Sequence, residues 1–120
     1  ACVGDGSYMF ANPVACHQIS EAMDLPILTI IKNNGIWNAV RRSVVNSYPG
    51  GKAASANRMP LVSLEPSPDF QMIARASRAH AERVEEADDL PAALERALRV
   101  IREERRSALL DVRVAQSDRH

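Results

Sequence analysis

The sequence has no excess of charge of either sign, because 15 lysine and arginine residues balance 15 aspartate and glutamate residues among its 120 positions. No summed electrostatic field therefore favours nucleic acid, an anionic membrane or an acidic partner. The sequence also lacks an apolar run near the roughly 20 residues that a membrane span needs, and its N-terminus lacks the basic and apolar regions of a signal peptide. We therefore expect a cytoplasmic protein without nucleic-acid or membrane partners, in which any bound anion is held by local contacts.

Cysteine is scarce, since Cys2 and Cys16 are the only two in the sequence. Two cysteines are too few for a disulfide framework, and neither a CxxC motif nor a Cys/His metal spacing is present. Both are predicted to be buried thiols in a reducing compartment. The sequence opens directly on the end of an apolar strand and its turn, ACVGDG, without an initiating methionine. We interpret this opening as a sign that the chain is part of a longer polypeptide.

What the sequence does contain is a regular alternation of short apolar runs and helical periodicities. The apolar runs predict strands at residues 1–3, at 27–31, around Val84 and at 108–114. Helical spacing and helix-start signals predict helices at 13–23, at 36–44, from Ser67 onward and at 90–101. Residues 46–66 are rich in Ser, Gly, Pro and Asn, which predicts a long loop that is functional or mobile.

The order of these elements predicts the fold class. Strands that alternate with helices indicate βαβ units with right-handed crossovers. The run at residues 27–31 is apolar on both faces, as in a strand inside a parallel sheet. We therefore expect a three-layer α/β fold with helices on both faces of a parallel sheet, in one domain over residues 1–115 followed by a polar tail at 116–120. Four strands are few for such a sheet, which is typical of a partial domain.

Two polar residues follow consecutive predicted strands. Asp5, between Gly4 and Gly6, comes directly after the first strand, and Asn34 comes directly after the second. Ligands of such sheets bind beyond the carboxyl ends of the strands, and neighbouring strands lie about 4.8 Å apart, so both side chains can reach one small cation. Magnesium prefers hard oxygen ligands, usually one or two carboxylates with phosphate oxygens of a ligand. The spacing therefore predicts a magnesium site made by Asp5, the Asn34 amide oxygen and a main-chain carbonyl just after Gly35.

Beside this predicted cation site, Gly6 permits close approach of the backbone to a ligand, and Ser7 offers a hydroxyl and an N–H to a diphosphate. The pattern GDG, residues 7–32 and then NN resembles the cofactor signature of thiamine-diphosphate-dependent enzymes. The stretch NNGIWNAVRRS is most similar to the branch of acetolactate synthase and benzoylformate decarboxylase. The resemblance extends to the C-terminal strand and implies a flavodoxin-like, diphosphate-binding domain.

The resemblance assigns roles to individual residues. It implies that magnesium is bound by the side chains of Asp5 and Asn34 and by the carbonyl of Ile36. The residues that it implies as contacts of thiamine diphosphate are Gly4, Asp5, Gly6, Ser7, Asn34, Ile36 and Trp37. Family members also need a second, pyrimidine-binding domain, whose glutamate activates the cofactor. No catalytic residue is therefore expected in this chain, and the chain alone is expected to be inactive.

The same resemblance implies an enzyme that acts on a 2-keto acid by decarboxylation or carboligation, as a homodimer or homotetramer. Whether that enzyme also binds a flavin is left open. The alternative is a non-catalytic regulatory or assembly module that keeps the fold without turnover. An intact pair of Asp5 and Asn34 favours the enzyme over the module.

Other patterns in the sequence do not support competing functions. A dinucleotide-binding motif needs a third glycine where Met9 stands, and GGKA at residues 50–53 lacks the remaining residues of a P-loop. His17 and His80 are predicted to be structural or surface residues, because no nucleophile stands near them in sequence. Trp37 is interpreted as a packing residue, with contact to cofactor or substrate as the alternative.

Overall fold

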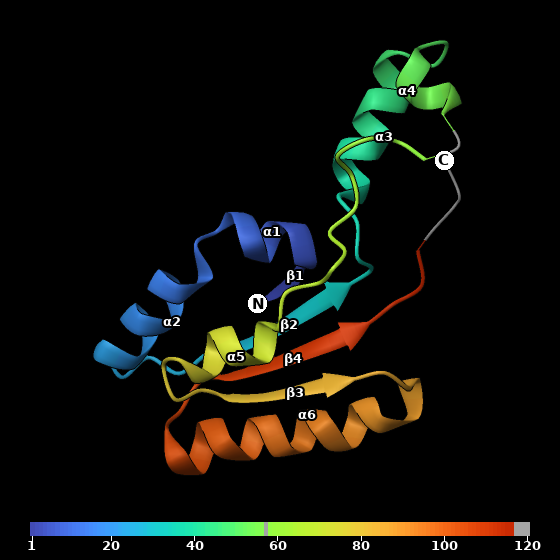
Figure 1. Cartoon of the computed structure of the whole chain (residues 1–120). Coiled ribbons are helices and arrows are strands. Elements are labelled where there is room, and N and C mark those ends of the chain that lie inside the picture. Colours follow the sequence, from blue (N-terminus) through green and yellow to red (C-terminus); the bar gives the residue numbers. More distant parts are fainter. Residues whose placement is uncertain (57, 117–120) are drawn as a thin grey trace.

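The computed structural model describes residues 1–56 and 58–116, and its centre is a four-stranded sheet (Figure 1). The strands are β1 (Cys2–Gly4), β2 (Leu28–Asn33), β3 (His80–Val84) and β4 (Ala108–Arg113). They lie in the order β1-β2-β4-β3, and each neighbouring pair is parallel. β2, which has an apolar sequence on both faces, lies between two neighbours. The prediction of a parallel sheet is confirmed.

Helices cover both faces of this sheet (Figure 1). One face carries α1 (Asp5–Phe10), α2 (Pro13–Ala22) and α5 (Phe70–Arg75). The other face carries α6 (Leu90–Arg99). The 3-10 turn η1 (Ala87–Asp89) precedes α6, and the π-helical turn η2 (Val100–Glu104) continues it. Side chains alternate along β4 and connect the layers: Leu109 belongs to the core cluster with Phe70 of α5, whereas Leu110 belongs to the cluster with Ala97 of α6. The predicted three-layer α/β fold is therefore confirmed.

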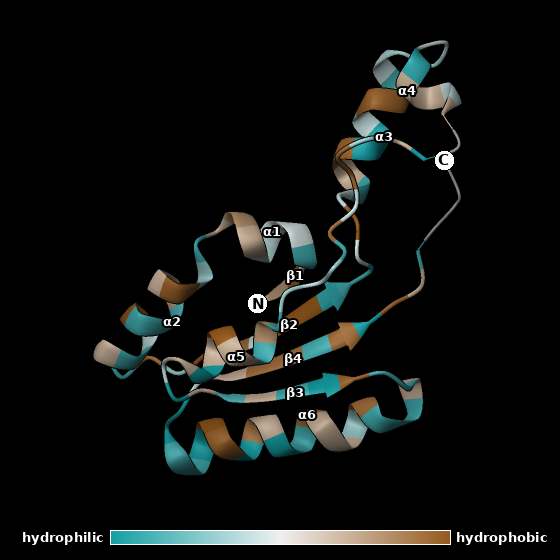
Figure 2. Cartoon of the chain, viewed as in Figure 1, coloured by the Kyte–Doolittle hydropathy of each residue, from teal (hydrophilic) through white to brown (hydrophobic). Residues whose placement is uncertain are grey.

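The long helix α6 shows how the sequence pattern produces this packing. Ala93 and Ala97 are buried against the sheet, and Leu90 and Leu94 pack beside them. Figure 2 accordingly shows α6 as alternating hydrophobic and hydrophilic segments. Proline at the second helical position is compatible with the helix start, because the first turn has no intrahelical partner for its missing N–H.

Two helices extend away from the sheet beyond the carboxyl ends of β2 and β4: α3 (Asn38–Ser47) and α4 (Lys52–Ser55) (Figure 1). No residue of α3 is buried within the described structure. The molecule is elongated as a result, with principal extents of 54 × 31 × 21 Å. The chain returns from α4 to the sheet through an antiparallel bridge between Ile36 and Ser63.

The segment predicted as one long loop, residues 46–66, is more structured than expected. α3 continues to Ser47, α4 lies within the segment, and the side chains of Val62 and Leu64 are buried. The Trp37 N–H donates to the Val62 carbonyl at 2.7 Å, and the Leu64 N–H donates to the Gly35 carbonyl at 2.8 Å. The end of the segment is therefore fixed to the turn after β2.

The third predicted helix begins later than expected. α5 starts at Phe70 rather than at Ser67, because the Asp69 side chain acts as the N-cap and accepts a hydrogen bond from the Met72 N–H at 2.9 Å. Asp69 is itself a favoured N-cap residue type, so the sequence contained this helix-start signal. The Ser67-Pro68 pattern, two residues earlier, led to the wrong start.

The prediction that both cysteines are buried is wrong, since both side chains are exposed. The buried residues of α2 are Pro13, His17 and Ser20, which are four and three positions apart and so lie on one face of the helix. Cys16 does not lie on that face. Cys2 begins β1, which is an edge strand of the described sheet.

Of the polar tail predicted at residues 116–120, only Gln116 lies inside the described residues, so the domain boundary at 115 stays a prediction. In residues 1–56 and 58–116, no helix has both the length and the apolar character that crossing a membrane requires.

Candidate functional site

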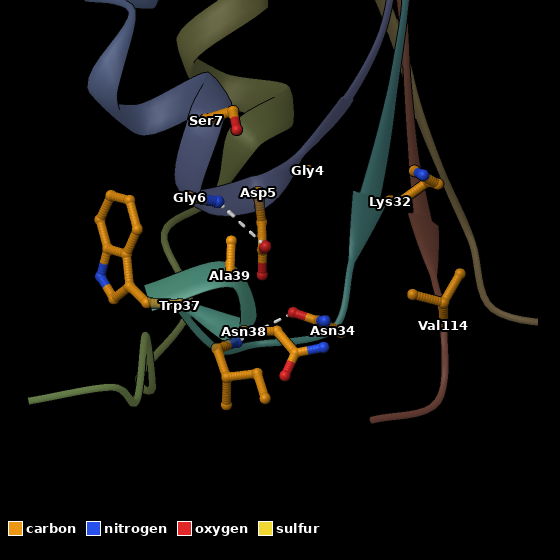
Figure 3. A pocket seen from close by; sticks show the side chains of 11 residues that line it. Gly4, Asp5, Gly6, Ser7, Lys32, Asn34, Trp37, Asn38, Ala39 and Val114 are labelled. Carbon is orange, nitrogen blue, oxygen red and sulfur yellow. Dashed lines mark hydrogen bonds between the residues drawn. The ribbon is translucent and has the colours of Figure 1, made fainter. Parts of the chain in front are cut away.

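A cavity of about 270 Å³ opens at the carboxyl ends of β1 and β2 (Figure 3). β1 and β2 are paired with Gly4 opposite Lys32, so the residues that follow both strands meet at one edge of the sheet. The lining consists of Gly4, Asp5, Gly6, Ser7, Lys32, Asn34, Ile36, Trp37, Asn38, Ala39 and Val114. The structure therefore brings together every residue that the sequence assigned to the metal and cofactor site.

Asp5 is the first residue of α1 and is almost fully buried, with 3% of its surface exposed. Its Oδ1 accepts a hydrogen bond from the Gly6 N–H at 2.9 Å, and its Oδ2 accepts one from the Gly35 N–H at 2.7 Å. The carboxylate thus joins the turn after β1 to the turn after β2. No ion pair to Asp5 is present among residues 1–56 and 58–116. The two hydrogen bonds that Asp5 accepts come from neutral backbone N–H groups.

The turn after β2 has the conformation that its Asn-Gly sequence favours. Gly35 has a φ of 71°, in the left-handed region, and a Cβ atom there would lie 2.7 Å from the Glu65 Oε1. The Asn34 Oδ1 accepts a hydrogen bond from the Ile36 N–H at 3.1 Å. The Ile36 carbonyl accepts one from the Asn38 N–H at 2.9 Å. Both oxygens keep a further lone pair for a ligand.

Gly6 and Trp37 fit against each other on one side of the cavity. A Cβ atom at Gly6 would lie 2.6 Å from Cε3 of the indole ring. This position therefore requires glycine for close approach of the ring, whose place beside Asp5 is visible in Figure 3. The interpretation of Trp37 as a packing residue agrees with this contact, and contact of the indole with a cofactor stays a prediction.

The donor set of this cavity fits a hard cation. A buried carboxylate with no charged partner is unfavourable, and a divalent ion at this position would compensate its charge. Asp5, the Asn34 amide and the Ile36 carbonyl all offer oxygen atoms, which magnesium prefers. The described residues contain no cluster of three or more His, Cys, Asp or Glu side chains that could hold a metal. An ion bound here would depend on one carboxylate, neutral oxygens and oxygens of a ligand or water.

The sequence predicted only a turn at GDG, whereas the structure has the short helix α1 at Asp5–Phe10. A helix of six residues has too few positions to show a periodic pattern. It is held instead by Tyr8, whose buried ring packs edge-on against Phe70 with ring centroids 5.4 Å apart. Gly6 and Ser7 therefore lie in the first turn of a helix, and this correction leaves both beside the cavity.

Four lining residues were not predicted: Lys32, Asn38, Ala39 and Val114. Lys32 directly precedes the Asn-Asn pair, which was a usable signal. Asn38 begins α3, and its buried Oδ1 has no hydrogen-bond partner within the described structure. Val114 had no local signal, because its place depends on the pairing of β4 with β2, where its N–H donates to the Asn33 carbonyl at 2.9 Å.

His17 lies outside this cavity and has a structural contact. Its Nε2 lies 2.8 Å from the hydroxyl of Tyr8, beneath α1. Burial lowers the pKa of His17, so the neutral ring is favoured. The pKa of Tyr8 is raised, first by burial and then by the nearby Cys16 and Asp111. The structural interpretation of His17 agrees with this environment.

Comparison with known proteins adds independent information. The fold is similar to that of a thiamine diphosphate-dependent 4-hydroxybenzoylformate decarboxylase from Rhodococcus jostii RHA1, with a TM-score of 0.77 and 23% sequence identity. The similarity covers 98% of this chain but 20% of that chain, so the present sequence spans about a fifth of the decarboxylase. No curated protein matches the sequence. Residues 1–112 match the family described as "Thiamine pyrophosphate enzyme, C-terminal TPP binding domain". The chain therefore belongs to the family of C-terminal thiamine-pyrophosphate-binding domains of thiamine pyrophosphate enzymes.

Proposed function

We propose that this chain binds magnesium and thiamine diphosphate as the diphosphate half-site of an enzyme that acts on 2-keto acids. The observation that carries the proposal is the buried carboxylate of Asp5, which shares one cavity with Asn34 and Ile36 and has no ion-pair partner in the described structure. The family membership supports the cofactor, and the donor set supports the metal.

Each residue of the cavity has a proposed task. Asp5 and Asn34 hold magnesium by their side-chain oxygens, and Ile36 holds it by its carbonyl. Gly6 and Ser7 would hold the diphosphate, because both line the cavity and the exposed serine offers a hydroxyl. Gly4 and Trp37 complete the walls on the cofactor side.

The proposed reaction class is decarboxylation or carboligation of a 2-keto acid, as in the branch of acetolactate synthase and benzoylformate decarboxylase. Thiamine diphosphate, when bound, would supply the electron sink that decarboxylation of a 2-keto acid needs. The comparison structure is named for the decarboxylation of 4-hydroxybenzoylformate, which is itself a 2-keto acid. The residues of this chain bind and orient the diphosphate end of the cofactor and exclude water from one side of it.

The rest of the active site is proposed to lie on a pyrimidine-binding domain outside this sequence. That domain would supply the glutamate that activates the cofactor, and the parent enzyme would be a cytoplasmic homodimer or homotetramer. Residues 1–115 would form the part of the diphosphate-binding domain that is present.

The test is a calorimetric titration of the chain with thiamine diphosphate in the presence and absence of magnesium. We expect weak binding that requires magnesium and that is lost in Asp5→Ala, because the diphosphate charge is then poorly neutralised. Asp24→Ala is the matched control, since Asp24 is exposed and forms an ion pair with Arg105 away from the cavity.

Undiminished affinity of Asp5→Ala would contradict the metal assignment. Absence of any magnesium-dependent binding by the unmodified chain would favour the alternative of a non-catalytic module with the same fold.

A further inference from the structure

A buried polar network lies directly behind the candidate site. Its centre is Asn33, the last residue of β2, whose side chain is fully buried. The amide nitrogen donates to Asp111 Oδ1 at 2.9 Å and to Ser67 Oγ at 3.4 Å. The amide oxygen accepts from the Gly35 N–H at 3.2 Å and from Arg113 Nη1 at 3.1 Å. The hydrogen-bonding capacity of this amide is therefore fully used.

Asp111 extends the network to the other edge of the sheet. It is fully buried, and its Oδ2 accepts a hydrogen bond from Arg83 Nε at 3.0 Å and forms an ion pair with Arg83 Nη2 at 2.9 Å. The parallel register places Arg83 of β3 opposite Asp111 of β4. Asp111 in turn lies opposite Ile31 of β2, two residues before Asn33 on the same face. A continuous set of contacts thus runs across three strands from Arg83 to Gly35.

The position of the Gly35 peptide depends on this network. Its N–H is shared between Asn33 Oδ1 at 3.2 Å and Asp5 Oδ2 at 2.7 Å. Rotation of the Asn33 amide would turn its oxygen toward Asp111 Oδ1 and leave that buried oxygen without its donor, although Arg83 would still pair with Oδ2, and a buried acceptor without a donor is unfavourable. The orientation of Asn33 is therefore fixed, and the distance between the Gly35 turn and the Asp5 carboxylate is fixed with it.

We infer that Arg83 and Asp111 are positioning residues of the metal site, which act through Asn33 on the turn that carries Asn34. Neither side chain lines the cavity. Their effect on the geometry of the turn is a property of the chain itself, whereas their effect on magnesium and diphosphate binding rests on the proposed function. Residues that orient a metal ligand from behind typically change metal affinity by about 10- to 100-fold when they are replaced.

The first arm of the test needs no cofactor. Amide hydrogen exchange of Gly35 is measured by NMR in the chain and in Asp111→Asn, which removes the charge but keeps the size of the side chain. We expect faster exchange at Gly35, with unchanged exchange in α6. Arg83→Met is the second variant, and Arg96→Met is its control. Arg96 also forms an ion pair with a carboxylate, that of Glu82 on β3, but Arg96 lies on α6 and not in the network.

The second arm measures the affinity for thiamine diphosphate with magnesium by calorimetry. We expect Asp111→Asn and Arg83→Met to lower the affinity by about 10-fold or more, and Arg96→Met to leave it unchanged. Arg83→Lys keeps a cationic donor for Asp111, so we expect its affinity to lie nearer to that of the unmodified chain than to that of Arg83→Met.

The two arms separate the two claims. Unchanged exchange at Gly35 in folded Asp111→Asn would overturn the inference, whatever the cofactor does. Normal affinity in Asp111→Asn and Arg83→Met would overturn it as well. If the unmodified chain does not bind the cofactor, the proposed function fails, and the exchange measurement still decides whether the turn is positioned by this network.

Discussion

At the residue scale, the site depends on side chains with specific sizes and hydrogen-bonding capacities. Asp5 receives two backbone donors from different turns, and Gly6 leaves space for the indole of Trp37. The residue types and their spacing were visible in the sequence, because Asp5 and Asn34 each follow a recognisable strand. The partners of Asp5 were not visible, since they depend on backbone N–H groups whose direction the turn geometry sets.

The contact between Gly6 and Trp37 gives a prediction. Gly6→Ala places a Cβ atom within 2.6 Å of the ring, so the indole has to move. We expect a loss of about 1–3 kcal/mol in the free energy of unfolding, together with a shifted emission spectrum of Trp37, the only tryptophan of the chain. Chemical denaturation followed by fluorescence measures both.

Gly50→Ala is the control for this substitution, because a Cβ atom at Gly50 meets no described atom within 4 Å. Equal stability of both variants would show that the packing of Trp37 on Gly6 contributes nothing.

The burial of His17 gives a prediction of pH dependence. Burial lowers the pKa of this ring below its ordinary value of 6.5. As the pH falls below 6.5, the unfolded chain therefore binds a proton that the folded chain does not, and stability that is fully present above this pH is lost progressively. We expect the free energy of unfolding, measured by urea titration, to fall as the pH is lowered through about 6.5, and His17→Gln to reduce this fall. The same slope in the variant would contradict the assignment to His17.

At the scale of elements, regular patterns predicted the strands and the long helices, and short or tertiary features escaped prediction. The run at residues 27–31 became β2, and the periodicity at 90–101 became α6 and the start of η2. α1 and α4 are too short to show a period, and α1 forms because Tyr8 is buried in the core. The Asp111 network was invisible for another reason, since its members lie far apart in sequence. An acid inside the apolar run ALLDV was the one local hint of it.

The segment after α3 gives a prediction at the same scale. We expect the amides of residues 50–56 to exchange rapidly in the absence of cofactor and partner domain, because α4 contains no buried residue within the described structure. The Leu64 amide should exchange more slowly, because it donates to the Gly35 carbonyl. Exchange mass spectrometry measures both regions, and addition of cofactor with magnesium should slow the first. Slow exchange throughout the segment in the free chain would contradict this prediction.

At the scale of the whole molecule, the sequence predicted the fold class and the family, and its candidate site residues line one cavity at the carboxyl ends of β1 and β2. The chain corresponds to 20% of the comparison structure, so the pocket for the substrate is proposed to come from other segments. The identity of the proposed 2-keto acid substrate could not be predicted for that reason.

The last prediction concerns turnover. We expect the chain alone to release no carbon dioxide from pyruvate or benzoylformate, even with thiamine diphosphate and magnesium in excess, because the activating glutamate is proposed to lie on another domain. A half-site also lacks the walls that would exclude water from the reacting carbon. Detection of cofactor-dependent carbon dioxide by the purified chain would contradict the assignment of a half-site.

The strand order β1-β2-β4-β3 also has a kinetic consequence. Among the strands of residues 1–56 and 58–116, β4 comes last in sequence, but it lies between β2 and β3, and these two strands are not hydrogen-bonded to each other. During synthesis, the earlier strands can therefore form only a β1–β2 pair and a separate β3, each with an open edge. Sheet assembly has to wait until residues 108–113 are available, which gives the chain a high contact order and makes folding a late, cooperative event. The strand that completes the described sheet also carries Asp111, so the geometry of the turn after β2 would be set in that same step.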